Sequence, residues 1–177
     1  MTDRQTLPLD AGPCRLRPWL DGDQIPLVLA ANHRAVWLGL RDRFPHPYTL
    51  ADAEAWIGLN LADPMPLNLA VEVGGTVAGG IGLLPQSDIF RVSAELGYWL
   101  SPDRWGRGIM TAAVQAFTVW AFGTRPLERI YARTFASNPA SGRVLEKAGY
   151  RLEGILRRSA LKDGQLLDIR LYARLRE

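Results

Sequence analysis

The sequence predicts an α+β fold of mixed α/β character, a mixed and mostly antiparallel sheet of six to seven strands with helices on both faces. Segments of strand and helix type follow one another in the order β-α-α-β-β-β-α-β-α-β-β. Tight turns at Gly74-Gly75 and Lys162-Asp-Gly164 join two strand pairs, as antiparallel neighbours favour. The strand at 93–100 has no purely polar side, which indicates cover on both faces.

The first half of the chain opens with a polar stretch and then alternates strands with helices. Residues 1–13, with their Pro and Gly, predict a flexible N-terminal arm, and residues 14–177 a single domain. Thr49-Leu-Ala-Asp52 resembles a capping box that opens a helix, and Asp21 or Asp23 lies near the start of an earlier one. The predicted elements are a strand at Cys14–Trp19, helices at Asp21–Arg34 and from Thr49 to Leu61, and strands at Leu67–Val73 and Thr76–Leu84.

The second half holds the clearest periodic patterns. After the strand Ser93–Leu100, apolar residues recur at helical spacing, which predicts a helix over Gly108–Phe122. Asn138-Pro139 is typical of a helix start, and Gly149 of a helix end. The remaining predicted strands are Arg129–Phe135, Tyr150–Leu161 and Gln165–Leu175.

Composition narrows the class of protein. An apolar content of 47% and a charged content of 22% are ordinary for a globular domain. Cys14 is the single cysteine, which excludes an internal disulfide, and neither His33 nor His46 has the spacing of a metal ligand. No apolar run is long enough to span a bilayer and none follows Met1 as a signal segment, so we expect a cytoplasmic protein without a metal or a membrane partner.

A basic glycine turn precedes the predicted helix at 108. Gly106-Arg107-Gly108 places free N–H groups and the positive end of a helix dipole beside a flexible backbone, which suits a phosphate or pyrophosphate. The alternative is a glycine turn that only joins a strand to a helix. A second segment, Asn138-Pro-Ala-Ser141 with Gly149-Tyr150 after it, reads locally as a capped helix.

Together, AELGYWLSPDRWGRGIMTAA (94–113) and NPASGRVLEKAGY (138–150) resemble the GNAT superfamily of acetyl-CoA-dependent N-acetyltransferases. The branch they most resemble includes the ribosomal-protein N-terminal (Ser/Ala) acetyltransferases. The resemblance runs from about Arg15 to Leu175 and implies a GNAT fold, acetyl-CoA as cofactor, and acetyl transfer to a primary amine of a protein N-terminus or small molecule. It implies direct attack in a ternary complex, and it is compatible with a homodimer. The alternative is a non-catalytic acyl-CoA-binding or sensor module, since fold alone does not fix activity.

The resemblance also implies a cofactor site. The family frame Gln/Arg-x-x-Gly-x-Gly/Ala falls on Trp105–Met110, where Gly108 matches while Trp105 and Met110 depart from it. The main chain of 106–109 would hold the pyrophosphate, and the backbone of Trp99 and Leu100 would align pantetheine. The implied cofactor-binding residues are Trp99, Leu100, Arg104, Trp105, Gly106, Arg107, Gly108, Ile109, Met110, Asn138, Ser141, Arg143 and Lys147.

Two residues are implied to carry the chemistry. Glu95 would remove the proton of the acceptor amine, and the alternative is a Glu bonded to a neighbouring Arg. Ser141 would protonate the departing thiolate, helped by the helix N-terminus.

The acceptor would meet the loop from Trp37 to Tyr48, where Trp37, Phe44, His46 and Tyr48 are the candidate binding residues. The alternative is a Pro-braced loop whose aromatic side chains complete the core. The charge distribution supports separate sites for the cofactor and the acceptor. Residues 1–88 hold 6 Arg against 10 Asp/Glu, and residues 89–177 hold 15 Lys/Arg against 8 Asp/Glu. We expect the cofactor phosphates on the basic half and a cationic acceptor near the acidic half, unless the asymmetry is only a solvated surface. Nucleic acid is not expected as a partner, because no binding motif or continuous basic run is present.

Overall fold

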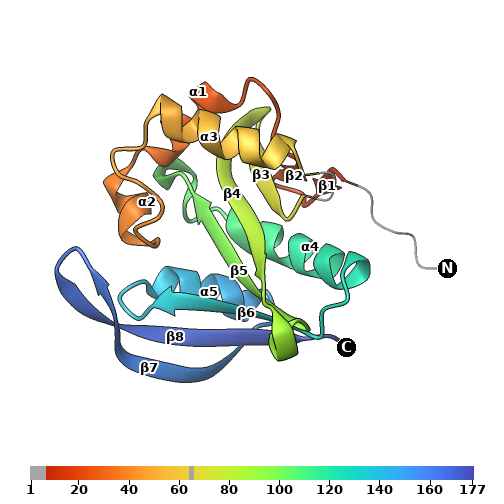
Figure 1. The fold of residues 1–177 in the computed structure, drawn as a ribbon, viewed down its shortest axis with the longest axis vertical. Coiled ribbons are helices and arrows are strands. Elements are labelled where there is room, and N and C mark those ends of the chain that lie inside the picture. The colour runs from red at the N-terminus through yellow and green to blue at the C-terminus, as the bar shows by residue number, and fades with distance from the viewer. Residues whose placement is uncertain (1–6, 64–65) are drawn as a thin grey trace.

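A computed structural model describes residues 7–63 and 66–177 (Figure 1). The helices are α1 (Gln24–Ala31), α2 (Arg34–Leu38), α3 (Leu50–Leu61), α4 (Ile109–Thr124) and α5 (Pro139–Lys147), with 3-10 turns η1 (Asp88–Phe90) and η2 (Pro102–Arg104). The strands are β1 (Leu9–Asp10), β2 (Arg15–Arg17), β3 (Asn68–Val73), β4 (Thr76–Pro85), β5 (Ser93–Leu100), β6 (Arg129–Phe135), β7 (Arg151–Lys162) and β8 (Gln165–Leu175).

In the part of the chain that the structure describes, the strands form one eight-stranded sheet in the order β1-β2-β3-β4-β5-β6-β8-β7. Every neighbouring pair is antiparallel except β5 with β6, so the mixed, mostly antiparallel sheet is confirmed with one strand more than predicted. The additional strand is β1, in which Leu9 pairs with Leu16 and is buried. Within the N-terminal arm predicted for residues 1–13, Leu9–Asp10 therefore form a strand, whereas residues 1–6 lie outside the described residues.

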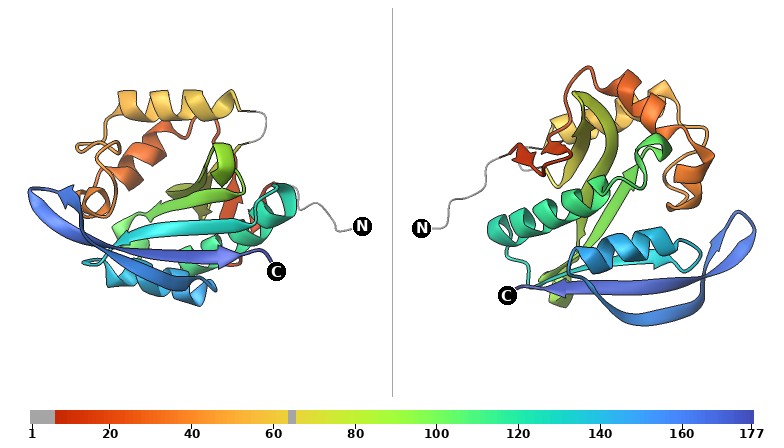
Figure 2. Two further views of the ribbon diagram at one scale, coloured as in Figure 1. Left: turned by 60° about the horizontal axis from the view of Figure 1, so that its bottom comes forward. Right: turned by 180° about the vertical axis from the view of Figure 1, so that it is seen from behind.

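Helices cover both faces of the sheet, as predicted. The helices α1, α2 and α3 lie on one face, and α4 and α5 lie on the other (Figure 2). The core is divided accordingly. The larger cluster joins α4 and α5 to the sheet through residues such as Phe117, Ile130 and Leu145, while the smaller cluster joins α1 and α3 to Trp19 and Ala70.

Of the helix predicted over Asp21–Arg34, the structure has the shorter α1 (Gln24–Ala31), and a separate helix that was not predicted, α2, begins at Arg34. Asp23 does not cap α1 with its side chain, because the carboxylate accepts two hydrogen bonds from Arg17, at 2.7 and 2.9 Å. At the other end, Asn32 leaves the helical conformation and its side chain accepts the Tyr48 N–H at 3.0 Å. Tertiary contacts therefore set both ends of α1, whereas the capping box of Thr49 and Asp52 at α3 is present as predicted.

The feature that positions the site is the short pairing of β5 with β6. These strands pair at only three positions, from Ser93 opposite Arg129 to Glu95 opposite Tyr131. The other edge of β5 pairs with β4 up to Leu100. The second half of β5 therefore has an edge that β6 does not fill.

Close packing of α5 on β8 gives a direct test of the fold. A Cβ on Gly142 would lie 2.7 Å from the hydroxyl oxygen of Tyr172. Because a packed interior does not accommodate such an overlap, we expect Gly142→Ala to lower the free energy of unfolding by about 1–3 kcal/mol, measured by urea denaturation.

Gly58→Ala is the matched control, because Gly58 lies in α3 with open space where its Cβ would be. This change should stabilise the protein by up to about 1 kcal/mol, since Ala has the higher helix propensity. Tyr172→Phe in the Gly142→Ala background should recover part of the loss. Equal stability of Gly142→Ala and wild type would contradict the packing described.

Candidate functional site

The open edge of β5 presents main-chain groups of alternate residues. Ser101 N–H donates to Ala78 O and Gln86 N–H donates to Ser93 O, so the odd-numbered residues of β5 face β4. Because successive main-chain groups along a strand point to opposite sides, those of Tyr98 and Leu100 face away from β4, toward the opening. The pantetheine alignment predicted for Trp99 and Leu100 is corrected accordingly: the main chain of Trp99 faces β4, and that of Tyr98 faces the opening.

The glycine turn lies between β5 and α4. Gly106 and Gly108 have φ of 74° and 75°, a left-handed conformation that favours glycine, and Gly108 is the N-cap of α4 without a side-chain cap. The first N–H groups of α4 therefore lack a capping side chain, as the phosphate-binding prediction requires. Trp105, at the position where the family frame has Gln or Arg, donates its indole N–H to Leu100 O at 2.8 Å. This bond ties the turn to the end of β5.

Side chains around the turn divide into solvent-facing and core groups. Arg107 is exposed, and Arg104 forms an ion pair with Asp103 at 3.0 Å. Ile109 and Met110 are buried in the core under α4, so only their main chain is available to a ligand at the turn. Met110 thus replaces the small residue of the family frame because its side chain packs inward.

Ser141 lies at the start of α5, opposite the open half of β5. Asn138 caps this helix by accepting the Ser141 N–H at 3.2 Å, as predicted. The Ser141 hydroxyl lies 2.7 Å from the hydroxyl of Tyr98, which also donates to Ser141 O at 3.1 Å. Burial raises the pKa of Tyr98 well above its ordinary value, so this phenol keeps its proton at neutral pH.

Glu95 lies on the opposite face of β5 from Tyr98, because their positions differ by an odd number. It is 9% exposed and forms an ion pair with Arg41, and Arg133 Nη1 lies 4.0 Å from its other carboxylate oxygen. The alternative considered for Glu95, a bond to a neighbouring Arg, is therefore present in the structure. Gly97 follows on the same face with open space where a Cβ would be, and Trp99 packs edge-on against Phe44 with centroids 5.6 Å apart.

Residues 14–151 match the acetyltransferase (GNAT) domain. The chain belongs to the GNAT family. A ribosomal-protein-serine acetyltransferase of Escherichia coli is 34% identical over 83 residues, which cover 47% of this chain and 46% of that protein. The chain spans about half the length of the curated relatives it matches.

Solved structures agree with the fold. A GNAT-family acetyltransferase of Bacillus anthracis, 22% identical, aligns with a TM-score of 0.82 over 96% of this chain and 98% of that chain. A ribosomal L7/L12 alpha-N-protein acetyltransferase in complex with coenzyme A, 21% identical, has a TM-score of 0.78 over 97% of this chain and 98% of that chain. The expected family is therefore confirmed, and ribosomal-protein acetyltransferases are among its relatives.

In this GNAT domain, the loop from Trp37 to Tyr48 is held by the tip of the β7–β8 hairpin (Figure 1). Lys162, with a side chain only 3% exposed, donates to Asp42 at 2.6 Å and its Nζ lies 3.6 Å from the centre of the Trp37 ring. His46 stacks on Trp37 with centroids 5.9 Å apart. Trp37 is therefore part of the scaffold of the loop.

Of the other two aromatic candidates in this loop, Tyr48 belongs to the core. It is 5% exposed, and burial raises the pKa of its hydroxyl to about 12. Phe44 packs against both Tyr48 and Trp99. The alternative in which the loop aromatics complete the core therefore describes Tyr48, whereas Phe44 also borders the face of β5 that carries Glu95.

Three residues of the candidate site were not predicted from the sequence: Tyr98, Arg41 and Arg133. Strand parity shows that Tyr98 shares its face with Leu96 and Leu100, but nothing in the sequence places it against Ser141. Arg41 lies 54 residues before Glu95, so no local pattern connects them. The predicted Arg143 and Lys147 are both exposed on α5.

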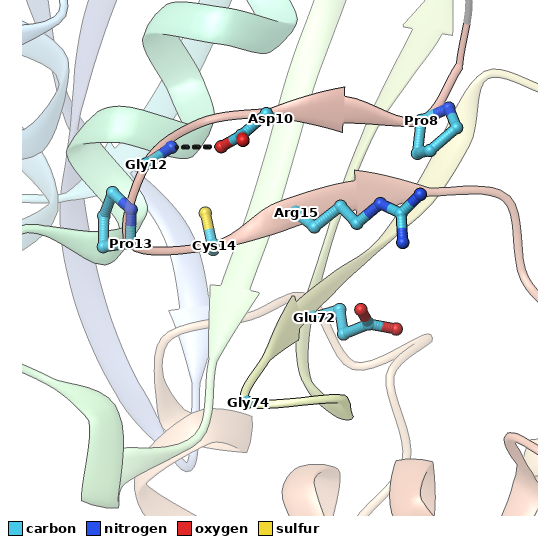
Figure 3. A pocket seen from close by; sticks show the side chains of 8 residues that line it. All are labelled: Pro8, Asp10, Gly12, Pro13, Cys14, Arg15, Glu72 and Gly74. Atoms are coloured by element: carbon cyan, nitrogen blue, oxygen red, sulfur yellow. Dashed lines mark hydrogen bonds between the residues drawn. The ribbon is translucent and has the colours of Figure 1, made fainter.

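A pocket lies away from the candidate site, at the β1–β2 edge of the sheet (Figure 3). It has a volume of about 520 Å³ and its lining includes Asp10, Cys14 and Glu72, with β3 and β4 between it and β5. Among residues 7–63 and 66–177, no group of His, Cys, Asp and Glu is arranged to hold a metal ion. No helix within those same ranges is long and apolar enough to cross a membrane.

Burial of Cys14 leads to a prediction on stability at high pH. Desolvation, helped by the charge of Asp10, raises the pKa of the Cys14 thiol from its ordinary value of 9.0 to about 11. The unfolded chain thus ionises first, and the stability that the neutral thiol contributes is present below pH 9.0 and lost as the pH rises toward about 11.

Urea denaturation of wild type and Cys14→Ala should therefore give free energies of unfolding that converge as the pH rises through this range. At neutral pH, a thiol reagent should label the folded protein slowly and the unfolded protein fast. Fast labelling of the folded protein at pH 7 would contradict the burial of Cys14.

Proposed function

We propose that this protein transfers the acetyl group of acetyl-CoA to a primary amine, by direct attack in a ternary complex. The observation that carries the proposal is the placement of two groups on opposite faces of β5: Glu95, the last residue of β5 that pairs with β6, and the Tyr98–Ser141 pair at the open half. An acetyl group at this edge would have a carboxylate on one face and a hydroxyl pair on the other. A reaction that removes a proton from the attacking group and returns one to the leaving group needs such a pair.

The residues around the opening fit acetyl-CoA. The main chain of 106–109, with Arg104 and Arg107 nearby, would hold the pyrophosphate at the start of α4. The main-chain groups of Tyr98 and Leu100 would align pantetheine as an added strand. The Thr134 hydroxyl on β6 is buried and has no hydrogen-bond partner among the described residues, so the strand bordering the opening also offers a polar group.

Three exposed or half-exposed residues on α5 complete the proposed cofactor site. Asn138 would contact pantetheine beside its capping bond, and Arg143 and Lys147 would reach the ribose phosphate. Their separation of four residues places the two cations on one side of the helix.

The chemistry follows from the two faces. Glu95 takes a proton from the ammonium group of the acceptor, which requires Arg41 to release the carboxylate. The amine nitrogen then attacks the thioester carbonyl, and the nitrogen loses its second proton to solvent as the tetrahedral intermediate collapses and the carbon–sulfur bond breaks. Ser141 protonates the leaving thiolate and recovers a proton from solvent, while Tyr98 holds the Ser141 hydroxyl in place across the 2.7 Å contact. The chain's one thiol, Cys14, is buried near α4, so it is not placed to relay the acetyl group in the proposed direct transfer.

The remaining parts of the proposal rest on the resemblance. We propose that the protein is cytoplasmic, where acetyl-CoA is available. Three further predictions are a single domain over residues 14–177, a homodimer, and no nucleic-acid partner. The single reduced cysteine supports the cytoplasmic location.

Substitution of the proposed base and acid tests the mechanism. We expect Glu95→Gln and Ser141→Ala each to lower kcat by roughly 10²–10⁴-fold, the range of general acid–base catalysis, while the Kd for acetyl-CoA changes little. Turnover is measured as free coenzyme A thiol released over a panel of amines, and the Kd by calorimetry.

Glu54→Gln and Ser159→Ala are the matched controls, because both residues are exposed and lie outside the site. Both control variants should keep wild-type turnover. Wild-type turnover of Glu95→Gln and Ser141→Ala would contradict the assigned roles. Cofactor binding without thiol release from any amine in the panel would favour the non-catalytic sensor instead.

The glycine turn has its own test. An Ala at Gly108 would have to adopt a left-handed conformation that costs about 1–2 kcal/mol, so the turn should open and the Kd for acetyl-CoA should rise several-fold. Gly12→Ala is the control, because Gly12 has a φ of 78° and equally open space but lies at the β1–β2 edge. An unchanged Kd of Gly108→Ala would contradict the turn as the pyrophosphate site.

A further inference from the structure

The carboxylate of Glu95 is shared by two arginines. Arg41 forms an ion pair with one oxygen, and Arg133 Nη1 lies 4.0 Å from the other. The arginine side chains are 45% and 47% exposed, whereas that of Glu95 is 11% exposed. The three groups together carry a net charge of +1 at the face of β5 where the acceptor is proposed to enter.

Arg133 is held at this place by the parallel register of β6. Tyr131 lies opposite Glu95, and Arg133 follows two residues later on the same face. The guanidinium carbons of Arg129 and Arg133 lie 5.8 and 5.6 Å from the centre of the Tyr131 ring. The ring therefore supports both cations through cation–π contacts.

The two cations on Tyr131 differ in their partners. Arg129 forms a two-pronged ion pair with Glu153, so its charge is compensated. Among the described residues, the ion pair of Arg133 is a long contact to Glu95, which Arg41 already holds more closely. Arg133 is thus the cation of this group that has the capacity to bind a further anion.

From this arrangement we infer the class of acceptor, an inference that rests on the proposed acetyl transfer: the substrate is an amine that carries a carboxylate or phosphate a few bonds from its nitrogen. Arg133 binds that anion in the fork geometry that guanidinium offers, while the amine lies at Glu95. The short distance between Arg133 and Glu95 limits the span between the two groups of the substrate. The anion also draws Arg133 and Arg41 away from Glu95, which frees the base.

A cationic acceptor, as the charge of the two halves of the sequence predicted, is disfavoured at this point. A second positive charge on the substrate would lie beside two arginines, and like charges in one site repel. Two acidic residues of the first half already have cationic partners within the protein: Asp23 is bound by Arg17 and Asp42 by Lys162.

Matched acceptors test the inference. The amidated dipeptides Ala-Asp and Ala-Asn have side chains of the same shape and differ in charge beside the same amine, and Ala-Lys, with acetylation followed at its N-terminal amine, places a cation in the side chain at the same position. We expect kcat/KM for Ala-Asp to exceed that for Ala-Asn by about tenfold, which corresponds to about 1.4 kcal/mol, with Ala-Lys lowest. Two further pairs, alanine with alaninamide and phosphoethanolamine with ethanolamine, show whether the anion is a side-chain carboxylate, the main-chain carboxylate or a phosphate.

Two variants assign the preference to Arg133. In Arg133→Gln, the ratio of kcat/KM between Ala-Asp and Ala-Asn should fall to near unity. Arg129→Gln removes a cation from the same strand and the same ring, but one that Glu153 already pairs, and should keep the ratio. Raising the salt concentration should lower the wild-type ratio, because the contact is partly exposed.

The outcomes separate this inference from the proposed function. Equal kcat/KM for anionic and neutral partners in all three matched sets, or a ratio that survives Arg133→Gln, overturns the inference and leaves acetyl transfer in place. Thiol release that occurs with neutral or basic acceptors but not with anionic ones also overturns the inference and leaves acetyl transfer in place. If none of the acceptors gives thiol release while acetyl-CoA still binds in calorimetry, both the inference and the proposed function are overturned.

Discussion

The separation of β5 from β6 is the constraint on which the site depends. A strand in the middle of a sheet normally has both edges paired, and unpaired main-chain groups are costly when buried. Here β5 keeps its full pairing with β4 but leaves β6 after Glu95. The result is a strand edge inside the fold, with helices covering both of its faces, where an extended ligand can complete the hydrogen bonds that β6 does not make.

The alternation of side chains along β5 keeps the proposed acid and base on opposite faces of the strand. Side chains of a strand alternate between faces, so Glu95 points toward α1–α3 and Tyr98 toward α5. In the proposed reaction, one proton would be removed on the face of Glu95 and another supplied on the face of Ser141, with the reacting carbonyl between them at the strand edge. The same alternation leaves Gly97 on the face of Glu95, where the absence of a side chain keeps the approach open.

Structural features that depend only on neighbouring residues were predicted from the sequence. The capping box at Thr49, the Asn138 cap and the glycine turn at Gly108 depend on neighbouring residues, and each is present. The ends of α1 were not predicted, because Arg17 and Tyr48 set them from outside the helix. Strand β1 was missed because only its pairing with β2 orders so short a segment.

The same limit applies to the candidate site. Motifs indicated Glu95, Ser141 and the turn, but the partners that set their environment come from distant segments, Arg41 above all. Among the loop aromatics, Tyr48 and Phe44 could not be told apart from sequence, because their burial depends on α3 and β5. The environment of a side chain depends on tertiary contacts, and a single sequence gives little information about these.

The clamp between Lys162 and Asp42 spans 120 residues of chain, and this has a consequence for biogenesis. During synthesis, the segment from Trp37 to Tyr48 leaves the ribosome long before the β7–β8 hairpin that anchors it. The cofactor turn at Gly108 and its helix are complete earlier, and contacts of such long sequence separation form late in folding. A nascent chain therefore cannot close the wall of the proposed acceptor site until this hairpin has been synthesised.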